Sequence, residues 1–153
     1  VMSLVRQLPN QHYTIVTSGA NIAIELSQRS RSTVSCVGGQ ISSSTLSLSG
    51  PQAEAFLATV NIDTAVLAAT GYSAGAGFTV GSYTENSLKR RVIQKADKVI
   101  LLIDRSKLGR TLPFTFASLS DIDVVICDAP LPEDFIQAAR AAGTEVLQVQ
   151  PAK

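Results

Sequence analysis

Short apolar runs alternate along the chain with stretches whose apolar residues recur at helical spacing. Runs rich in β-branched residues predict strands, whereas apolar residues spaced three and four apart predict helices. The predicted strands cover 13–17, 32–39, 44–50, 63–70, 98–104, 123–128 and 145–149. The predicted helices cover 1–9, 21–29, 51–60, a basic stretch from about Ser82, and 132–143.

Strand and helix signals in alternation favour an α/β fold. We expect a mostly parallel sheet with helices on both faces, in which 63–70, 98–103 and 123–127 form central strands. The stretch 71–81 and the segment through Pro113 are expected to be loops. The opening helix has no N-cap residue before it, which suggests that the sequence begins inside a longer protein.

Composition and charge narrow the class of protein. At 153 residues the chain is long enough for one domain with a sizeable core. Hydrophobic residues make up 45% of the chain and charged residues 16%, which excludes a disordered protein. The formal net charge is +1, so the chain lacks the positive charge that a nucleic-acid-binding surface normally carries, and 89–91 is the one local basic candidate.

The cysteines indicate buried thiols rather than a disulfide framework, because Cys36 and Cys127 each lie in an apolar run. These two residues and the single His12 give no convincing metal-ligand spacing, so neither a metal nor a cofactor is expected. The sequence shows no apolar run of membrane-spanning length and no signal-peptide pattern. A reducing cytoplasm is therefore the expected compartment.

Four of the expected strand exits are polar or rich in glycine, at 17–21, 38–40, 71–79 and 104–107. In open α/β sheets, ligands bind beyond the carboxyl ends of the strands, so these exits are expected to converge on one cleft. Glu85, near the start of the basic helix, is expected to join them. The candidate ligand-binding residues are Ser18, Gly19, Asn21, Gly38, Gly39, Gln40, Gly75, Gly77, Glu85, Asp104 and Lys107.

Each glycine-rich exit also has a purely structural interpretation. Ser18 or Asn21 could cap a helix instead of marking amides that hold an anion. The pair at 38–39 could serve a tight turn. The glycines of 71–79 do not form a dinucleotide-binding fingerprint, so this stretch could be a ligand-covering loop or a plain connector.

The charged candidates leave alternatives open as well. Glu85 follows Ser82 at capping-box spacing, which explains its position without any ligand. Asp104 could cap a short turn with Lys107 in solvent, or Lys107 could act as a point charge for a phosphate group. Most of 89–91 is expected on a solvated helix face.

An ordered series of motifs resembles the C-terminal effector-sensing domain of DeoR-type transcriptional repressors, which regulate sugar metabolism in bacteria. The motifs are "IVTSGANIAIEL", "CVGGQI", "LSGPQAEAFL", "TGYSAGAGFT" and "ENSLKRRVIQKADKVILLIDRSKLGR". The resemblance covers nearly the whole chain and implies a single effector-sensing domain over 1–153 that forms a homo-oligomer. It also implies that a D-x-G-T-T-like phosphate loop and a helix-turn-helix domain precede this sequence, so operator DNA is a partner only through that domain.

The same stretch is similar to ribose-5-phosphate isomerase, whose Rossmann-like fold the sensor family is held to share. That enzyme carries a D-G-A-D carboxylate pair, a loop lysine, a helix-opening glutamate and a D-x-S-K motif. Glu85 matches the glutamate and 104–107 matches D-x-S-K, but 68–71 is neutral and 71–82 contains no lysine. Isomerisation of an aldose needs a base and a group that stabilises the enediolate, and here only the base is retained.

Binding without catalysis is therefore the favoured interpretation. The resemblance implies that a phosphorylated sugar or a related metabolite binds this domain and controls DNA binding by the repressor. A sugar-phosphate isomerase and a purely structural oligomerisation domain remain alternatives.

Overall fold

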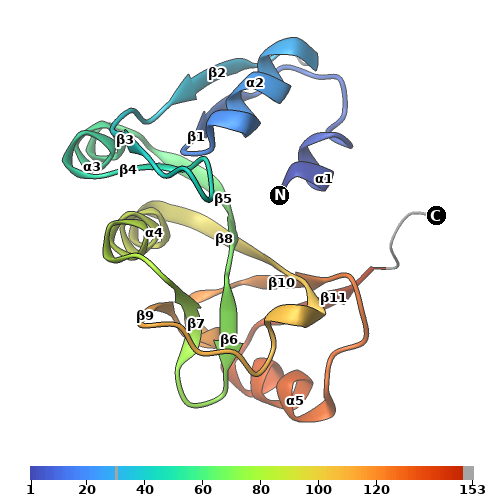
Figure 1. The fold of residues 1–153 in the computed structure, drawn as a ribbon. Helices are drawn as coiled ribbons and strands as arrows, with labels where there is room; N and C mark the ends of the chain where they lie inside the picture. The colour runs from blue at the N-terminus through green and yellow to red at the C-terminus, as the bar shows by residue number, and fades with distance from the viewer. Residues whose placement is uncertain (30, 150–153) are drawn as a thin grey trace. The chain divides into compact units, whose positions relative to one another are not determined.

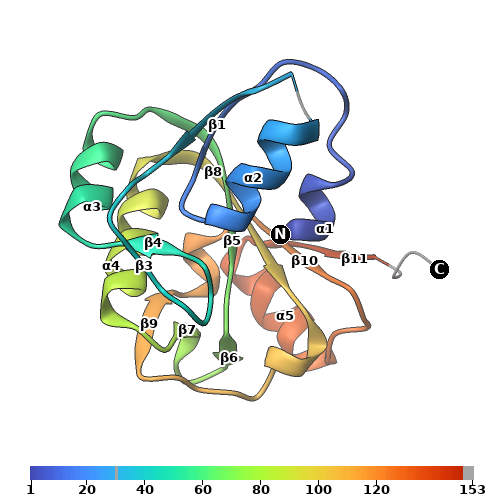
Figure 2. The same ribbon diagram turned by 45° about the horizontal axis from the view of Figure 1, so that its top comes forward.

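The structure is a computed structural model that describes residues 1–29 and 31–149. The chain divides into two compact units, Val1–Val60 and Asn61–Lys153. Figures 1 and 2 show the elements of both units in two views. That the two units together form a single sensing domain stays a prediction.

The first unit is built around a pair of parallel strands joined by a helix. Its elements are α1 (Met2–Val5), β1 (Thr14–Thr17), α2 (Ala20–Arg29), β2 (Thr33–Cys36), β3 (Gln40–Ile41), β4 (Leu48–Ser49) and α3 (Pro51–Ala58). Strands β1 and β2 run parallel, and β3 and β4 form a short antiparallel hairpin. Pro51 lies in the first turn of α3, where its missing N–H removes no helical hydrogen bond.

Three predictions for the first unit need correction. The helix expected over 1–9 is regular only in α1, because the following turn is tightened by a bond from Gln7 N to Leu4 O. The strand expected over 44–50 is reduced to β4, because Ser42 N and Leu46 N close a turn between 42 and 47. Cys36 is exposed rather than buried.

The larger sheet of the second unit is parallel and confirms the predicted fold class, an α/β fold with a mostly parallel sheet flanked by helices. Its strands follow the order β11-β10-β8-β5 (Figure 1). The elements are β5 (Ile62–Ala68), α4 (Tyr83–Lys95), β8 (Ala96–Ile103), β10 (Val124–Cys127), α5 (Glu133–Ala142) and β11 (Glu145–Gln148). As predicted, β8 and β10 are central, whereas β5 lies at one edge of this sheet.

A smaller antiparallel sheet covers a core that it shares with α5. It consists of β6 (Gly71–Ser73), β7 (Gly77–Val80) and β9 (Phe114–Ala117). The prediction of a loop over 71–81 was therefore wrong, and β9 was missed. The aromatic rings of Tyr72, Phe78, Phe116 and Phe135 pack together here and hold β6, β7, β9 and α5 around Leu101 and Val125.

Candidate functional site

The main chain at 18–20 is already hydrogen-bonded within the first unit. The Gly19 amide donates to Thr17 Oγ1 at 3.0 Å, and the Ala20 amide donates to Leu46 O at 2.9 Å. The Ser18 carbonyl accepts from the Leu48 amide at 2.7 Å. Each of these two amides therefore has a protein acceptor, which weighs against the hypothesis that they hold an anion.

Asn21 lies inside helix α2 rather than before it. The side chain of Asn21 is exposed, and its Oδ1 accepts only from the neighbouring Ile22 amide at 3.0 Å. Thr17 Oγ1 accepts from the amide of Gly19, the residue before α2. Ligand binding by Ser18 and Asn21 stays a prediction.

Gly38 and Gly39 adopt the left-handed conformations that make glycine necessary, with φ of 77° and 100°. A Cβ atom on Gly39 would lie 2.5 Å from the carbonyl oxygen of Ser49, whereas one on Gly38 would meet no atom within 4 Å. Gly39 is thus required by the approach of β4, and Gln40 follows it as the exposed first residue of β3. These contacts fit the tight-turn interpretation, and a ligand role for the three residues stays a prediction.

The glycines of 71–79 belong to the β6–β7 hairpin, which is fastened to β9. Gly77 has φ of 74°, and a Cβ atom there would lie 2.5 Å from Ala117 O. Thr115 Oγ1 donates to Ala76 O at 2.8 Å. Only Gly75, exposed at the tip, has open space around it. The hairpin is therefore an integral part of the small sheet, whether or not Gly75 and Gly77 also meet a ligand.

Glu85 forms an ion pair with Lys89, and the predicted capping box is absent. Lys89 Nζ lies 2.9 Å from Glu85 Oε1, and the two side chains are only 16% and 22% exposed. Ser82 is the N-cap of α4, but its side chain makes no capping hydrogen bond and instead lies 3.0 Å from Thr84 Oγ1.

Lys89 also reaches the carboxyl end of β5, a contact that the sequence did not reveal. Its ammonium group donates to the carbonyl oxygen of Ala68 and lies 5.0 Å from the ring centroid of Phe116. The prediction that most of 89–91 is solvated holds for Arg90 and Arg91, which are exposed, but not for Lys89. A cation therefore lies at the carboxyl end of β5.

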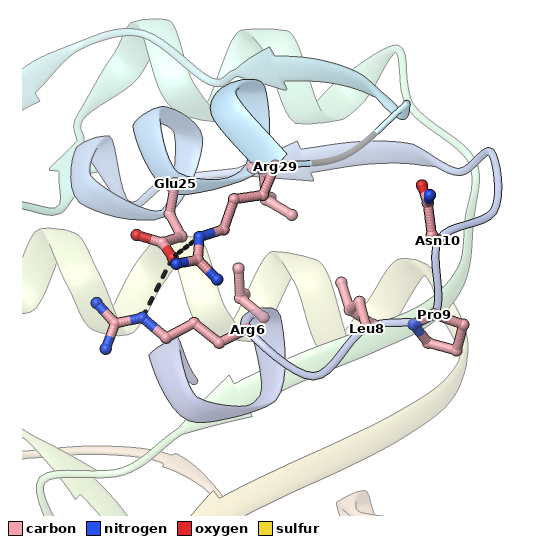
Figure 3. A pocket seen from close by; sticks show the side chains of 8 residues that line it. Arg6, Leu8, Pro9, Asn10, Glu25 and Arg29 are labelled. Carbon is pink, nitrogen blue, oxygen red and sulfur yellow. Dashed lines mark hydrogen bonds and ion pairs between the residues drawn. The ribbon is translucent and has the colours of Figure 1, made fainter.

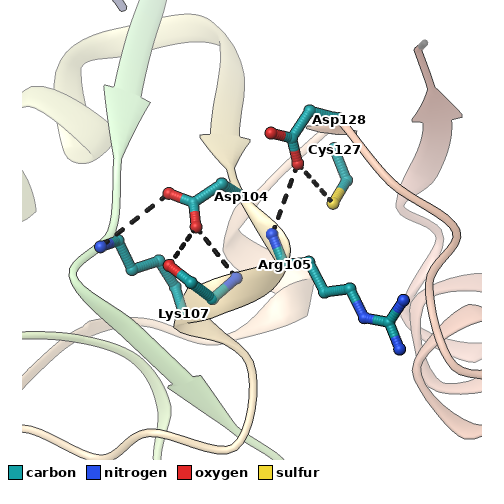
Figure 4. Close-up of polar contacts among 6 residues, drawn as sticks. Asp104, Arg105, Lys107, Cys127 and Asp128 are labelled. Carbon is teal, nitrogen blue, oxygen red and sulfur yellow. Dashed lines mark hydrogen bonds and ion pairs between the residues drawn. The ribbon is translucent and has the colours of Figure 1, made fainter. Parts of the chain in front are cut away.

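Asp104 and Lys107 lie together at the carboxyl end of β8 (Figure 4). Asp104 is the N-cap of the 3-10 helix η1 (Arg105–Lys107), and its Oδ1 accepts from the amide of Ser106 at 2.9 Å and from the Ser106 hydroxyl. Lys107 Nζ lies 3.9 Å from Asp104 Oδ2. Both side chains keep access to solvent, at 47% for Asp104 and 30% for Lys107. Capping is thus confirmed, while ligand binding stays a prediction.

Asp128, at the end of β10, joins this group and was missed by the sequence analysis. Its Oδ1 accepts from the Arg105 amide at 3.4 Å and lies 3.9 Å from the Sγ atom of Cys127 (Figure 4). The available signal was that the run "VVICD" ends in an acid, as the run "VILLID" does. Burial raises the pKa of the Cys127 thiol, and the nearby carboxylates of Asp128 and Asp104 raise it further.

The second unit therefore brings several predicted residues to the carboxyl ends of its parallel strands. Glu85 is ion-paired with Lys89, which donates to the carbonyl oxygen at the end of β5. Asp104 and Lys107 follow the end of β8. A bridge between Tyr72 and Leu108 connects the segment after η1 to β6. The convergence of these residues with those of the first unit stays a prediction.

A cavity of about 260 Å³ lies in the first unit, away from the predicted residues (Figure 3). Glu25 on α2 faces it and binds two guanidinium groups, those of Arg6 at 3.2 Å and Arg29 at 2.8 Å. None of the candidate ligand-binding residues lines this cavity. Its lining residues are Val5, Arg6, Leu8, Pro9, Asn10, Glu25, Leu26 and Arg29.

Within residues 1–29 and 31–149, His, Cys, Asp and Glu side chains do not gather in threes as a metal site requires. The helices in the described part of the chain are too short or too polar to span a bilayer.

Comparison with known proteins shows a match to one family and to several regulators. The family model described as the DeoR C terminal sensor domain matches residues 1–129. The chain is 34% identical over 147 residues to the HTH-type transcriptional regulator GlpR of Haloferax volcanii, covering 95% of the chain and 57% of that protein. It is 29% identical over 147 residues to the HTH-type transcriptional repressor GlcR of Bacillus subtilis, covering 96% and 57%.

A third relative is the glycerol-3-phosphate regulon repressor of Escherichia coli, with 28% identity over 130 residues. This match covers 85% of the chain and 52% of the repressor. The chain thus spans little more than half the length of these curated relatives.

Proposed function

The chain belongs to the family of DeoR C-terminal sensor domains, and we propose that its effector is a phosphorylated sugar or a related phosphorylated metabolite. The observation that carries this proposal is the arrangement of Asp104 and Lys107 after β8. A lysine whose ammonium group is 3.9 Å from its carboxylate neighbour and partly open to solvent can still offer donors to a phosphate. The carboxylate can accept from sugar hydroxyl groups.

One relative supports the phosphorylated class, because it is named as a repressor of a glycerol-3-phosphate regulon. Others are named as HTH-type transcriptional regulators, which supports a role in transcription. We infer that the effector shifts the affinity of a helix-turn-helix domain for operator DNA through thermodynamic linkage. Such a regulator acts where the DNA is, in the cytoplasm.

The test is calorimetric titration of the full-length regulator with a panel of sugar phosphates and the matching unphosphorylated sugars. Lys107→Ala should weaken binding of the phosphorylated effector by roughly 1.5–3 kcal/mol, the range for a hydrogen bond to a charged group. Lys98→Ala is the matched control, because Lys98 is an exposed lysine near the opposite end of β8. Equal losses in both variants, or binding of the sugar without its phosphate, would contradict the proposal.

Catalysis is the second candidate, and Glu85 is the observation that favours it. Against it, Glu85 is already paired with Lys89, and the end of β5 carries neutral side chains instead of carboxylates. We therefore expect no interconversion of ribose 5-phosphate and ribulose 5-phosphate above background in a coupled assay. Turnover on the order of one per second or faster would establish an enzyme instead.

A further inference from the structure

The cavity of the first unit is separate from the candidate effector residues of that unit. Its lining residues come from α1, from the loop that follows α1, and from the second half of α2 (Figure 3). Helix α2 runs back from the end of β1 to the start of β2, so its second half lies near the starts of these two parallel strands. The candidate residues at 18–21 and 38–40 instead follow the ends of the strands.

Two arginines share one carboxylate oxygen at this cavity. Arg6 Nε and Arg29 Nε both donate to Glu25 Oε1, at 3.2 and 2.8 Å. Two cations thus face one anion at the cavity wall. The side chain of Glu25 is only 17% exposed, whereas those of Arg6 and Arg29 are 57% and 64% exposed. The carboxylate is therefore largely removed from water, while both guanidinium groups stay accessible.

The stability of α2 explains only one of these arginines. Glu25 and Arg29 are four residues apart on α2, a spacing at which an ion pair supports a helix. Arg6 follows α1, 19 residues before Glu25 in the sequence, and adds a second cation beside the first. Bringing like charges together costs free energy that anions offset. Glu25 supplies one anion, and the cavity has room for another.

Each guanidinium group keeps hydrogen-bond donors for a second anion. A guanidinium group carries several N–H donors, and the contact with Glu25 uses the one at Nε. Among the described residues, the other donors of Arg6 and Arg29 have no acceptor. These terminal N–H groups form the planar fork whose geometry matches a carboxylate or phosphate group.

The rest of the cavity wall suits a small, partly apolar molecule. Val5, Leu8, Pro9 and Leu26 supply apolar surface, and Asn10 supplies an amide. The cavity volume of about 260 Å³ lies just below the range of about 300–1,000 Å³ for small-molecule sites, so its ligand is small. Apolar surface with a few polar groups that fix the orientation of the ligand is typical of such sites.

We propose that this cavity binds a small organic anion, a carboxylate or a phosphate monoester that carries a short apolar chain. The charged group of the ligand accepts hydrogen bonds from the terminal N–H groups of Arg6 and Arg29. The apolar chain lies against Leu8 and Pro9. Glu25 holds the two guanidinium groups together and is a positioning residue. This site is independent of the effector proposed above.

Nuclear magnetic resonance titration of the protein tests the site with ligands of matched shape. Butyrate and monobutyl phosphate carry both the charge and the apolar chain, whereas butyramide lacks the charge and inorganic phosphate lacks the chain. At constant ionic strength, the two organic anions should shift the Nε–H signals of Arg6 and Arg29 saturably, with dissociation constants on the order of millimolar. Butyramide and inorganic phosphate should bind about tenfold more weakly or worse. The absence of a saturable shift, or equally tight binding of either control ligand, would overturn the proposal.

Substitution of the two arginines tests the contacts. Arg6→Gln and Arg29→Gln should each raise the dissociation constant of butyrate about tenfold, because each removes a charged donor. Arg31→Gln is the matched control, since it removes the same charge from an exposed arginine that does not line the cavity. Equal weakening by all three variants would show general attraction to positive charge and would overturn the site.

Glu25 gives an effect of opposite sign. Glu25→Gln keeps an oxygen that can accept from Arg6 and Arg29 but removes the negative charge that repels the ligand. Butyrate should therefore bind about threefold more tightly or better. Urea denaturation checks that the variant is folded. Ion pairs that serve stability alone give no such gain, so unchanged or weaker binding by the folded variant would overturn the proposal.

Discussion

The two units differ at the strand exits where the sequence predicted ligand-binding residues. In the first unit, the exits after β1 and β2 are closed by the protein itself, through the amides of Gly19 and Ala20 and the approach of Ser49 to Gly39. In the second unit, Lys89 of α4 contacts the end of β5, and Lys107 follows the end of β8.

This difference separates residues needed for folding from residues free to bind. A glycine that accommodates a neighbouring carbonyl is needed for folding with or without a ligand. Lys107 is partly exposed, and its ammonium group lies 3.9 Å from the Asp104 carboxylate. Because an exposed ion pair contributes little to stability, the fold depends little on Lys107. Lys89 stands between these extremes, since it is charged but mostly buried.

The largest effect is expected at Gly39. Gly39→Ala combines a left-handed backbone conformation with a Cβ atom 2.5 Å from Ser49 O, so it should lower the free energy of unfolding by about 3 kcal/mol or more. Gly38→Ala is the matched control, with the backbone conformation but no atom within 4 Å, and should cost about 1–2 kcal/mol. Urea denaturation measures both. Equal losses would show that the approach of β4 is not the constraint.

Lys89 should rank second. Lys89→Met keeps the aliphatic stem but leaves Glu85 without its ion pair and Ala68 O without its donor, for an expected loss of about 2 kcal/mol. Arg90→Met, on the exposed neighbouring position of the same helix, should change stability by about 0.5 kcal/mol or less. A loss of the same small size at Lys89 would mean that its contacts are exchanged for water without cost.

Lys107→Ala should leave the fold almost unchanged. The ammonium group makes one long contact in a partly exposed setting, so the change in unfolding free energy should be about 0.5 kcal/mol or less. Thermal and urea melts of the variant and the wild type measure this directly. A loss as large as that of Lys89→Met would assign Lys107 to the framework and weaken its role in binding.

The sequence predicted the elements whose signals are local. Strands β8 and β10 are short apolar runs, and α5 ends at Gly143 in the left-handed conformation that favours glycine. The β6–β7 hairpin escaped prediction because its glycines are explained by distant neighbours. Gly71 faces Arg110 O and Gly77 faces Ala117 O, contacts that no local pattern encodes.

The candidate site could be predicted only in part, because some of its contacts join residues that are far apart in the sequence. The motif at 104–107 placed Asp104 and Lys107 together, since residues three apart in a turn are neighbours. Lys89 escaped notice because its acceptor, Ala68 O, lies 21 residues away in sequence. Asp128 escaped because only the pairing of β10 with β8 brings it to the Arg105 amide.

The smallest expected effect is a change in how the free energy of unfolding depends on pH, tested at one cysteine of each unit. Cys36 in the first unit is exposed, whereas Cys127 in the second is buried. Burial raises the pKa of the Cys127 thiol above its ordinary value of 9.0. As pH rises, the unfolded chain therefore loses this proton before the folded protein does. Below about pH 9, the contribution of the protonated thiol to the free energy of unfolding is fully present. That contribution declines as the pH rises through the pKa of the thiol in the folded protein.

Cys127→Ala should consequently show a shallower alkaline decline in unfolding free energy than the wild type. Some decline should remain, because burial and then the charge of Asp134 raise the pKa of Tyr72 in the same direction. Cys36→Ala removes the exposed thiol and serves as the control. Urea denaturation from about pH 7.5 to about pH 10 measures all three proteins. If Cys127→Ala kept the wild-type slope, ionisation of this buried thiol would not contribute to the alkaline loss of stability.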